Sequence, residues 1–256
     1  MNRIRAIARN DLRLLRRDPA FLIIFTITPI AFMAFNESAI GAALGVRFPH
    51  AQVNGAAYVV PAATVIFSGF LVGNVGFGVF REHGWGTWER LRASPLTPNE
   101  LMLGKSVVPI LTISFQIAVL LTAGFVLFDL DVRGSMVAFV AVALALAVMN
   151  VALGFMLLSV CKSVIQLNAL ATAGAMLIGG LGGALTPVEF LPGWAQAIAP
   201  FTPAYWAMQG FREVTLKPGG MADVAVPLLV LAGFTAVFTV VAMVRFRVED
   251  TKISWA

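Results

Sequence analysis

Few residues of this sequence have a type and spacing that could support chemistry. The segment Asn99–Ser106 (NELMLGKS) ends in the Gly-Lys-Ser of a phosphate-binding loop, but Asn99 stands where the first glycine belongs. Such a loop needs glycines so that backbone N–H groups can curve around the phosphates. We therefore reject a nucleotide site here and expect Lys105 to anchor a helix end at the lipid headgroups.

Reactive groups are otherwise sparse. The single cysteine, Cys161, provides neither a disulfide framework nor a metal cluster, and we expect it to be a small core residue. Apart from Asp223 near the start of the last run, the long apolar runs delimited below contain no Asp, Glu, Lys, Arg or His. Ion-coupled carriers ordinarily need an ionisable group at membrane depth, and membrane enzymes need a nucleophile with a base or a metal cluster. The sequence therefore predicts no catalytic residue and no metal site, and it disfavours both classes.

Isolated amides are the notable polar groups inside these runs. Interhelical hydrogen bonds are the default role for such side chains in membrane helices, and contact with a ligand is the alternative. The residues are Asn74, Gln116, Asn150, Gln166 and Asn168.

The composition indicates a membrane protein. The 256 residues are 59% apolar and only 12% charged, whereas a soluble domain is about half apolar and roughly a quarter charged. The net charge of +5 could suggest a nucleic-acid partner, but the placement of the basic residues argues against one. We expect membrane lipids, and no nucleic acid, around this chain.

Runs of about 20 apolar residues predict six transmembrane helices. No stretch between them is long enough for a folded soluble domain. The sequence thus predicts an all-α, polytopic fold in which residues 1–256 form one transmembrane domain. The runs are Pro19–Phe35, Ala57–Phe80, Val107–Phe128, Met136–Val160, Val164–Leu185 and Ala222–Val244. The first is short and contains Pro29, so its outer end is either irregular or continues through the apolar stretch 40–46.

The N-terminal segment, residues 1–18, has apolar residues at helical spacing and six arginines largely elsewhere. This pattern predicts an amphipathic helix at the membrane interface, with a solvated basic tail as the alternative. No cleavage site of the A-x-A type follows the first apolar run, so we expect that run to be retained.

Basic residues are distributed unevenly between the alternate flanks of the spans. Fourteen of the 18 Lys and Arg residues fall in the N-terminal segment, the 81–105 loop, the 161–163 turn and the C-terminal tail. The positive-inside rule then predicts a multi-pass protein of the cell (inner) membrane with both termini in the cytoplasm.

Two stretches outside the spans are distinctive. The cytoplasmic loop 81–105 interleaves charges of both signs with Trp85 and Trp88, and residues 87–93 can form a short helix closed by prolines. Aromatic residues and arginine supply anchor energy at protein interfaces, so a docking surface and an ordinary interfacial loop are equally compatible with this composition. The outer stretch 186–206 is broken by prolines into apolar pieces too short to span, which predicts a re-entrant hairpin covered by protein.

Three of these features together resemble the permease subunits of type 2 ABC exporters, the family of bacterial drug, polyketide and cell-surface polysaccharide exporters. They are the basic amphipathic N-terminal helix, the pattern R-E-x-G-x-x-T-W-E-x-L-x-x-x-P-L-T over Arg81–Thr97, and the pattern P-x-x-x-x-P-x-W…P-x-x-P-x-x-W over Pro187–Trp206. With the six-span plan, the resemblance covers nearly the whole chain.

The resemblance implies a non-catalytic half of a membrane pore. It would work as a dimer, with itself or a sister permease, and with separate ABC ATP-binding subunits that bind ATP and Mg. The loop would act as a coupling helix that contacts the ATPase subunit through Glu82, Gly86, Thr87, Trp88, Glu89 and Leu91. The hairpin would form an outer gate with Pro187, Pro192, Trp194, Pro200 and Pro203.

Substrate contacts are expected at the dimer seam, on the second and fifth spans. Aromatic and Met side chains there would suit a hydrophobic or amphipathic substrate, such as a drug-like molecule or a lipid. The alternative role for each of these residues is contact with lipid. The alternative functions of the chain are a polysaccharide or teichoic-acid exporter and an assembly subunit. The candidates are Phe67, Phe70, Asn74, Phe77, Asn168 and Met176.

Overall fold

The computed structural model describes residues 2–17, 20–47, 54–94 and 97–246. All secondary-structure elements within these ranges are helices, which confirms the all-α prediction. The predicted number of spans is also confirmed, because six helical stretches in the described ranges are long and apolar enough to cross a membrane. They are Ile23–Val46, Ala56–Gly84, Glu100–Leu127, Met136–Val160, Val164–Leu181 and Ala225–Arg245.

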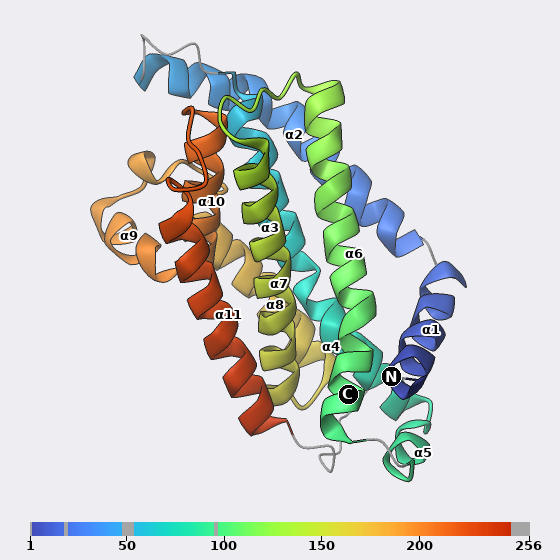
Figure 1. Ribbon diagram of the computed structural model, residues 1–256. Helices are drawn as coiled ribbons and strands as arrows, with labels where there is room; N and C mark the ends of the chain where they lie inside the picture. The colour runs from blue at the N-terminus through green and yellow to red at the C-terminus, as the bar shows by residue number, and fades with distance from the viewer. Residues whose placement is uncertain (1, 18–19, 48–53, 95–96, 247–256) are drawn as a thin grey trace.

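The helices pack into one bundle (Figure 1). At its centre α3 (Ala56–Phe70) contacts α2, α6, α7, α8 and α10 and is almost entirely buried, because small and β-branched residues cover its whole circumference. A break at Leu71 separates it from α4 (Val72–Gly84), which completes the second span. The other elements are α1 (Asn2–Arg17), α2 (Ala20–Arg47), α5 (Trp88–Arg92), α6 (Pro98–Leu127), α7 (Met136–Val160), α8 (Val164–Leu181), η1 (Val188–Phe190), α9 (Gly193–Ile198), η2 (Ala199–Phe201), α10 (Pro203–Thr215) and α11 (Ala225–Arg245).

Hydroxyl residues cap the starts of four helices. At the start of α6, the Thr97 hydroxyl accepts from the Glu100 N–H at 3.2 Å and the Glu100 carboxylate accepts from the Thr97 N–H at 2.9 Å. Ser135, Ser163 and Thr202 cap α7, α8 and α10 in the same way, each accepting from the N–H three residues on. These side chains satisfy backbone donors that have no partner within the helix, which fixes where the helices begin.

Prolines inside two helices leave carbonyls that other helices satisfy. Pro29 has no N–H for the Phe25 carbonyl one turn before it, and Gln116 Nε2 of α6 donates to that carbonyl at 2.8 Å. Pro61 leaves the Ala57 carbonyl in the same position, and Thr215 Oγ1 of α10 donates to it at 2.7 Å. The helix α2 therefore continues through Pro29 to Arg47, so the predicted end of the first span at residue 35 is wrong and its continuation through 40–46 is confirmed.

The basic segments gather at one end of the bundle. In Figure 1, α1, α5, the turn between α7 and α8 and the last turn of α11 all lie at the lower end, whereas the connections from α6 to α7 and from α10 to α11 lie at the other. The asymmetry of Lys and Arg along the sequence is thus an asymmetry between the two ends of the molecule.

Candidate functional site

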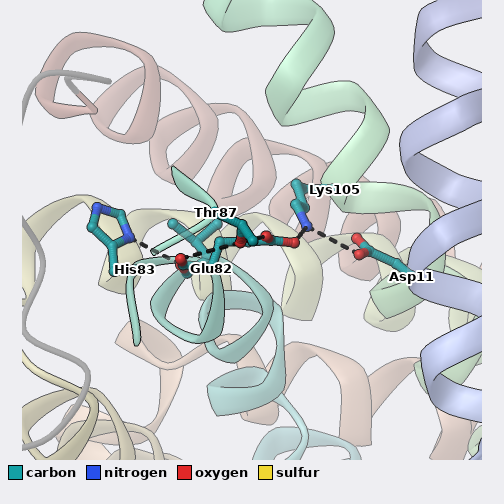
Figure 2. A network of polar contacts seen from close by, with 6 residues as sticks. Asp11, Glu82, His83, Thr87 and Lys105 are labelled. Carbon is teal, nitrogen blue, oxygen red and sulfur yellow. Dashed lines mark hydrogen bonds and ion pairs between the residues drawn. The ribbon is translucent and has the colours of Figure 1, made fainter. Parts of the chain in front are cut away.

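A buried polar cluster joins three helices at the basic end of the bundle. Lys105 Nζ of α6 donates to Asp11 Oδ1 of α1 at 3.0 Å and to Glu82 Oε1 of α4 at 2.9 Å. The Thr87 hydroxyl donates to the other carboxylate oxygen of Glu82, as Figure 2 shows. The cluster connects α1, α4, α6 and the turn before α5 through side chains that lie far apart in the sequence.

Burial determines the energetics of this cluster. The Lys105 side chain is 4% exposed, and the side chains of Asp11 and Glu82 are each 8% exposed. Burial raises the pKa of Asp11 above its usual value of 3.8, and the attraction of Lys105 opposes that rise only in part. An ion pair in such a place fixes an arrangement, because loss of one partner leaves the other charge buried and unpaired.

These contacts overturn two expectations from the sequence. We predicted Lys105 at the lipid headgroups, and this prediction is wrong because both of its carboxylate partners lie in the protein interior. We also predicted spans without ionisable residues. That prediction is wrong too, since Glu82 and Lys105 fall within the stretches Ala56–Gly84 and Glu100–Leu127, and Glu37 falls within α2.

Close packing of α1 on α6 brings Asp11 to the cluster. A Cβ built on Gly104 would lie 2.9 Å from the Cβ of Ile7, so only a glycine allows α1 to approach this closely. Ile7 is buried, and Asp11 follows it by one helical turn on the same face. The arginines Arg5, Arg9 and Arg13 are exposed, as the amphipathic pattern predicts.

The predicted short helix exists as α5, and the turn before it is fastened to α4. Gly86 has φ +67, a left-handed conformation that favours glycine, and it lets the chain reverse between α4 and α5. The Thr87 N–H then donates to the Glu82 carbonyl at 3.0 Å. Trp88 is buried and stacks on His83, with ring centroids 4.3 Å apart. The turn is therefore held against the end of α4 by backbone, side-chain and ring contacts.

The residues predicted to contact an ATPase subunit fall into two groups. Gly86 and Glu89 are exposed, together with Trp85 and Arg90, and they form an outward surface. Thr87 and Leu91 are half-buried, whereas Glu82 and Trp88 are buried and contact this chain instead. The inward group holds the segment in place, and an ATPase contact remains a prediction for the outward group.

An apolar cavity of about 550 Å³ brings together most of the predicted substrate residues. It lies between α2, α3, α4 and α8 and is lined by Phe67, Phe70, Asn74, Phe77 and Asn168. Met176 lies outside the lining, although its side chain is 46% exposed on the same helix as Asn168.

Interhelical hydrogen bonds are confirmed for two of the amides, and ligand contact stays a prediction for Asn74 and Asn168. Gln116 and Asn150 are buried and make structural hydrogen bonds, Gln116 to the backbone of α2 and Asn150 Nδ2 to Ser68 Oγ at 2.9 Å. Gln166 accepts from the Lys162 N–H at the start of α8. Asn74 and Asn168 face the cavity instead.

The predicted outer hairpin consists of η1, α9 and η2, which project from the side of the bundle next to α10 (Figure 1). Arg212 of α10 forms an ion pair with Glu189 of η1 at 2.5 Å, and Trp206 Nε1 donates to the Pro200 carbonyl at 2.7 Å. Pro187 and Pro203 are buried, whereas Pro192, Trp194 and Pro200 are exposed. The hairpin is thus anchored at its base, and its role as a gate and its re-entry into the membrane stay predictions.

Sequence reasoning missed Asp11 and Lys105 as members of the cluster. One signal was present for Asp11, the only acid among the arginines of α1, because it shares a helical face with Ile7 and Leu15. Its partner could not be predicted, since Lys105 lies 94 residues away. Within the described ranges, no group of three His, Cys, Asp or Glu residues could hold a metal ion.

The described residues thus combine six candidate membrane spans with a buried ion cluster at the basic end of the bundle and an open apolar cavity between α2, α3, α4 and α8. The family model of the ABC-2 type transporter matches residues 2–216, and the chain therefore belongs to that family, as the sequence patterns indicated. It is accordingly a permease subunit of an ABC transporter.

Two curated relatives come from Escherichia coli K12. The chain is 26% identical over 171 residues to the probable multidrug ABC transporter permease YbhR, and 27% identical over 176 residues to the inner membrane transport permease YhhJ. The matched parts cover 66% and 67% of this chain but 46% of each relative. The chain thus spans about half the length of the curated relatives it matches.

Proposed function

We propose that this chain is the transmembrane subunit of an exporter that moves a hydrophobic or amphipathic compound, such as a drug-like molecule or a lipid, out across the cell membrane. A separate ABC subunit would bind ATP and Mg and hydrolyse the ATP. The name of one relative, a probable multidrug ABC transporter permease, supports this substrate class. The charge asymmetry supports an inner-membrane protein with both termini in the cytoplasm.

The observation that carries the proposal is the path from the exposed turn to the cavity. Trp85, Glu89 and Arg90 belong to the outward surface, and the contact of Thr87 with Glu82 fastens this turn to α4, while Lys105 joins Glu82 to α6. The same helix lines the cavity with Asn74 and Phe77, which lie about two turns and about one turn before Glu82, respectively. A push on the turn by an ATPase subunit would therefore move a wall of the cavity as a rigid body.

A second permease copy would close the cavity. The flanking helices α2 and α8 leave large apolar side chains exposed on either side of it, including Ile24 and Ile27 on one and Ile165 and Leu170 on the other. Exposed apolar surface of this kind serves lipid or protein contact. We propose that these faces form the dimer seam, with the cavity as the substrate path.

The aromatic lining favours a second candidate substrate. Phe25, Phe67, Phe70 and Phe77 all border the cavity, as would suit a polysaccharide or teichoic-acid exporter that slides sugar rings along aromatic faces. Transport of a hydrophobic dye into inverted vesicles, compared with transport of a lipid-linked glycan, separates the two candidates.

The direct test is co-purification of the cognate ATPase subunit with this chain. We expect replacement of both Glu89 and Arg90 by Ala to weaken the association, because it removes two exposed charges from the outward surface. Lys217→Ala is the control, since Lys217 is also exposed but belongs to the connection from α10 to α11, which lies at the opposite end of the bundle from α5. If the double variant associates with the ATPase as well as the wild type does, the assigned contact surface is refuted. If no ATPase subunit associates with the wild type, an assembly subunit becomes the better explanation of this chain's function.

A further inference from the structure

A second cavity, of about 350 Å³, lies between α1, α4 and α6, next to the buried ion cluster. Its apolar part is formed by Leu14 and Leu15 of α1, Val75 of α4, and Val108 and Ile113 of α6. Its volume falls in the range of about 300–1,000 Å³ that is usual for small-molecule sites. The cavity therefore has room for part of a ligand with an apolar chain.

The polar end of this cavity contains a donor without an acceptor. Asp11, Arg81 and Lys105 line it, and Lys105 is paired with Asp11 and Glu82. The Arg81 guanidinium lies over the Trp85 ring, 5.0 Å from the centroid. Its Nε atom is buried and has no hydrogen-bond partner among the described residues. A buried N–H of this kind costs free energy until an oxygen accepts from it.

The surroundings favour an anionic oxygen as that acceptor. The charges of Lys105 and Arg81 are balanced by those of Asp11 and Glu82, and α1 carries further positive charge on its exposed face, in Arg5, Arg9 and Arg13, which lie outside the lining of the cavity. An amphipathic helix with arginines on its exposed face attracts anionic lipids at a membrane surface. The phosphate of such a lipid is a strong acceptor for arginine.

We propose that this cavity binds one anionic phospholipid, with its phosphate oxygen accepting from Arg81 and the first part of an acyl chain among the leucines of α1 and the apolar residues of α6. This site goes beyond the proposed function and does not depend on it. Asn74 and Phe77 of α4 line both this cavity and the candidate substrate path, so a bound lipid would support the wall that the two share.

Gly78 allows a test that leaves every charge in place. It lines the cavity, and a Cβ built on it meets no atom within 4 Å, so Gly78→Leu fills the apolar part without a clash. Gly233→Leu is the matched control, because Gly233 is also a helical glycine with open space around it, on α11 and outside this cavity. Arg81→Gln removes the charged donor by an independent route.

The experiment is native mass spectrometry of the purified chain titrated with phosphatidylglycerol or phosphatidylcholine. We expect one tightly retained phosphatidylglycerol in the wild type and in Gly233→Leu. Binding should weaken roughly tenfold or more in both variants. In Gly78→Leu the acyl chain loses its space, and in Arg81→Gln the phosphate loses its charged hydrogen-bond donor. Wild-type retention by both variants would overturn the proposal.

Two further outcomes are equally decisive. Equal retention of phosphatidylcholine would overturn the recognition of a negative charge. Displacement of the lipid by millimolar inorganic phosphate alone would show a site for a free anion and would overturn the lipid as its occupant. Because no arm measures transport, the result is independent of whether the chain exports anything.

Discussion

Lys105 is the residue whose removal the structure predicts to be most damaging outside the apolar core. Lys105→Met keeps the length and the apolar stem of the side chain but deletes the charge that lies 2.9 Å from Glu82 and 3.0 Å from Asp11. Both carboxylates would then stay buried without their ion-pair partner. Breaking a buried ion pair in this way costs about 3–5 kcal/mol, because the remaining charge keeps its desolvation penalty.

The expected loss is large enough to measure by thermal unfolding in detergent. At roughly 2–4 °C per kcal/mol for a chain of this size, the apparent midpoint should fall by about 6–20 °C. Lys217→Met is the matched control, because Lys217 pairs with Glu213 four residues away while remaining 64% exposed. A pair of that kind contributes about 0.3–0.5 kcal/mol, so the control should shift the midpoint by no more than about 2 °C.

Neutralising the partners should reverse much of the loss. The triple variant Asp11→Asn, Glu82→Gln, Lys105→Met contains no buried charge in the cluster, and replacing a complete buried ion cluster by neutral groups is often close to neutral. We expect it to unfold above Lys105→Met. The reasoning is refuted if Lys105→Met unfolds at the same temperature as Lys217→Met, or if the triple variant is less stable than Lys105→Met alone.

Two other predictions concern Asp11 and Thr215. Burial raises the pKa of Asp11 in the folded state. At a pH between 3.8 and this raised pKa, Asp11 is protonated in the folded state but ionised in the unfolded state. The free energy of unfolding therefore falls as the pH rises through this window. Wild type should therefore gain stability relative to Asp11→Asn as the pH is lowered toward 3.8, and a difference that does not change with pH would contradict the role of burial. Thr215→Val should lower the free energy of unfolding by about 1–3 kcal/mol, because it leaves the buried Ala57 carbonyl without a donor. The control is Thr122→Val, which removes an exposed hydroxyl that bonds within its own helix and should change the free energy by no more than about 0.5 kcal/mol. Similar unfolding midpoints for the two variants would argue against Thr215 as the donor that replaces the missing N–H of Pro61.

The spans and the candidate cavity could be predicted from the sequence because both follow from local patterns. Apolar runs near 20 residues set the helices, and the spacing of Phe67, Phe70, Asn74 and Phe77 places them on neighbouring turns of one span that face the same cavity. The sequence left the end of the first span open between two alternatives, because the carbonyl that Pro29 leaves unpaired accepts a hydrogen bond from Gln116, which lies 91 residues away.

The ion cluster shows a second limit of sequence reasoning. Charged residues near the ends of apolar runs are usually read as headgroup anchors, and this reading fails for Lys105 because Gly104 admits α1 and brings Asp11 beside it. The same packing turns Glu82 inward, although its motif predicts contact with a partner. Whether a motif residue faces outward or inward depends on tertiary contacts, and the pattern alone does not contain them.

The central claim is that the turn before α5 transmits motion to α4 through the Glu82 contacts, and one measurement tests it most directly. The quantity is the amount of hydrophobic dye transported per ATP hydrolysed, in vesicles that contain this chain and its ATPase subunit. It is compared between the wild type, Thr87→Val and Thr87→Ser. Valine keeps the shape of threonine but cannot donate to Glu82, whereas serine can. We predict that Thr87→Val still assembles and hydrolyses ATP but transports less dye per ATP, and that Thr87→Ser stays near wild type. An unchanged ratio in Thr87→Val would contradict the claim.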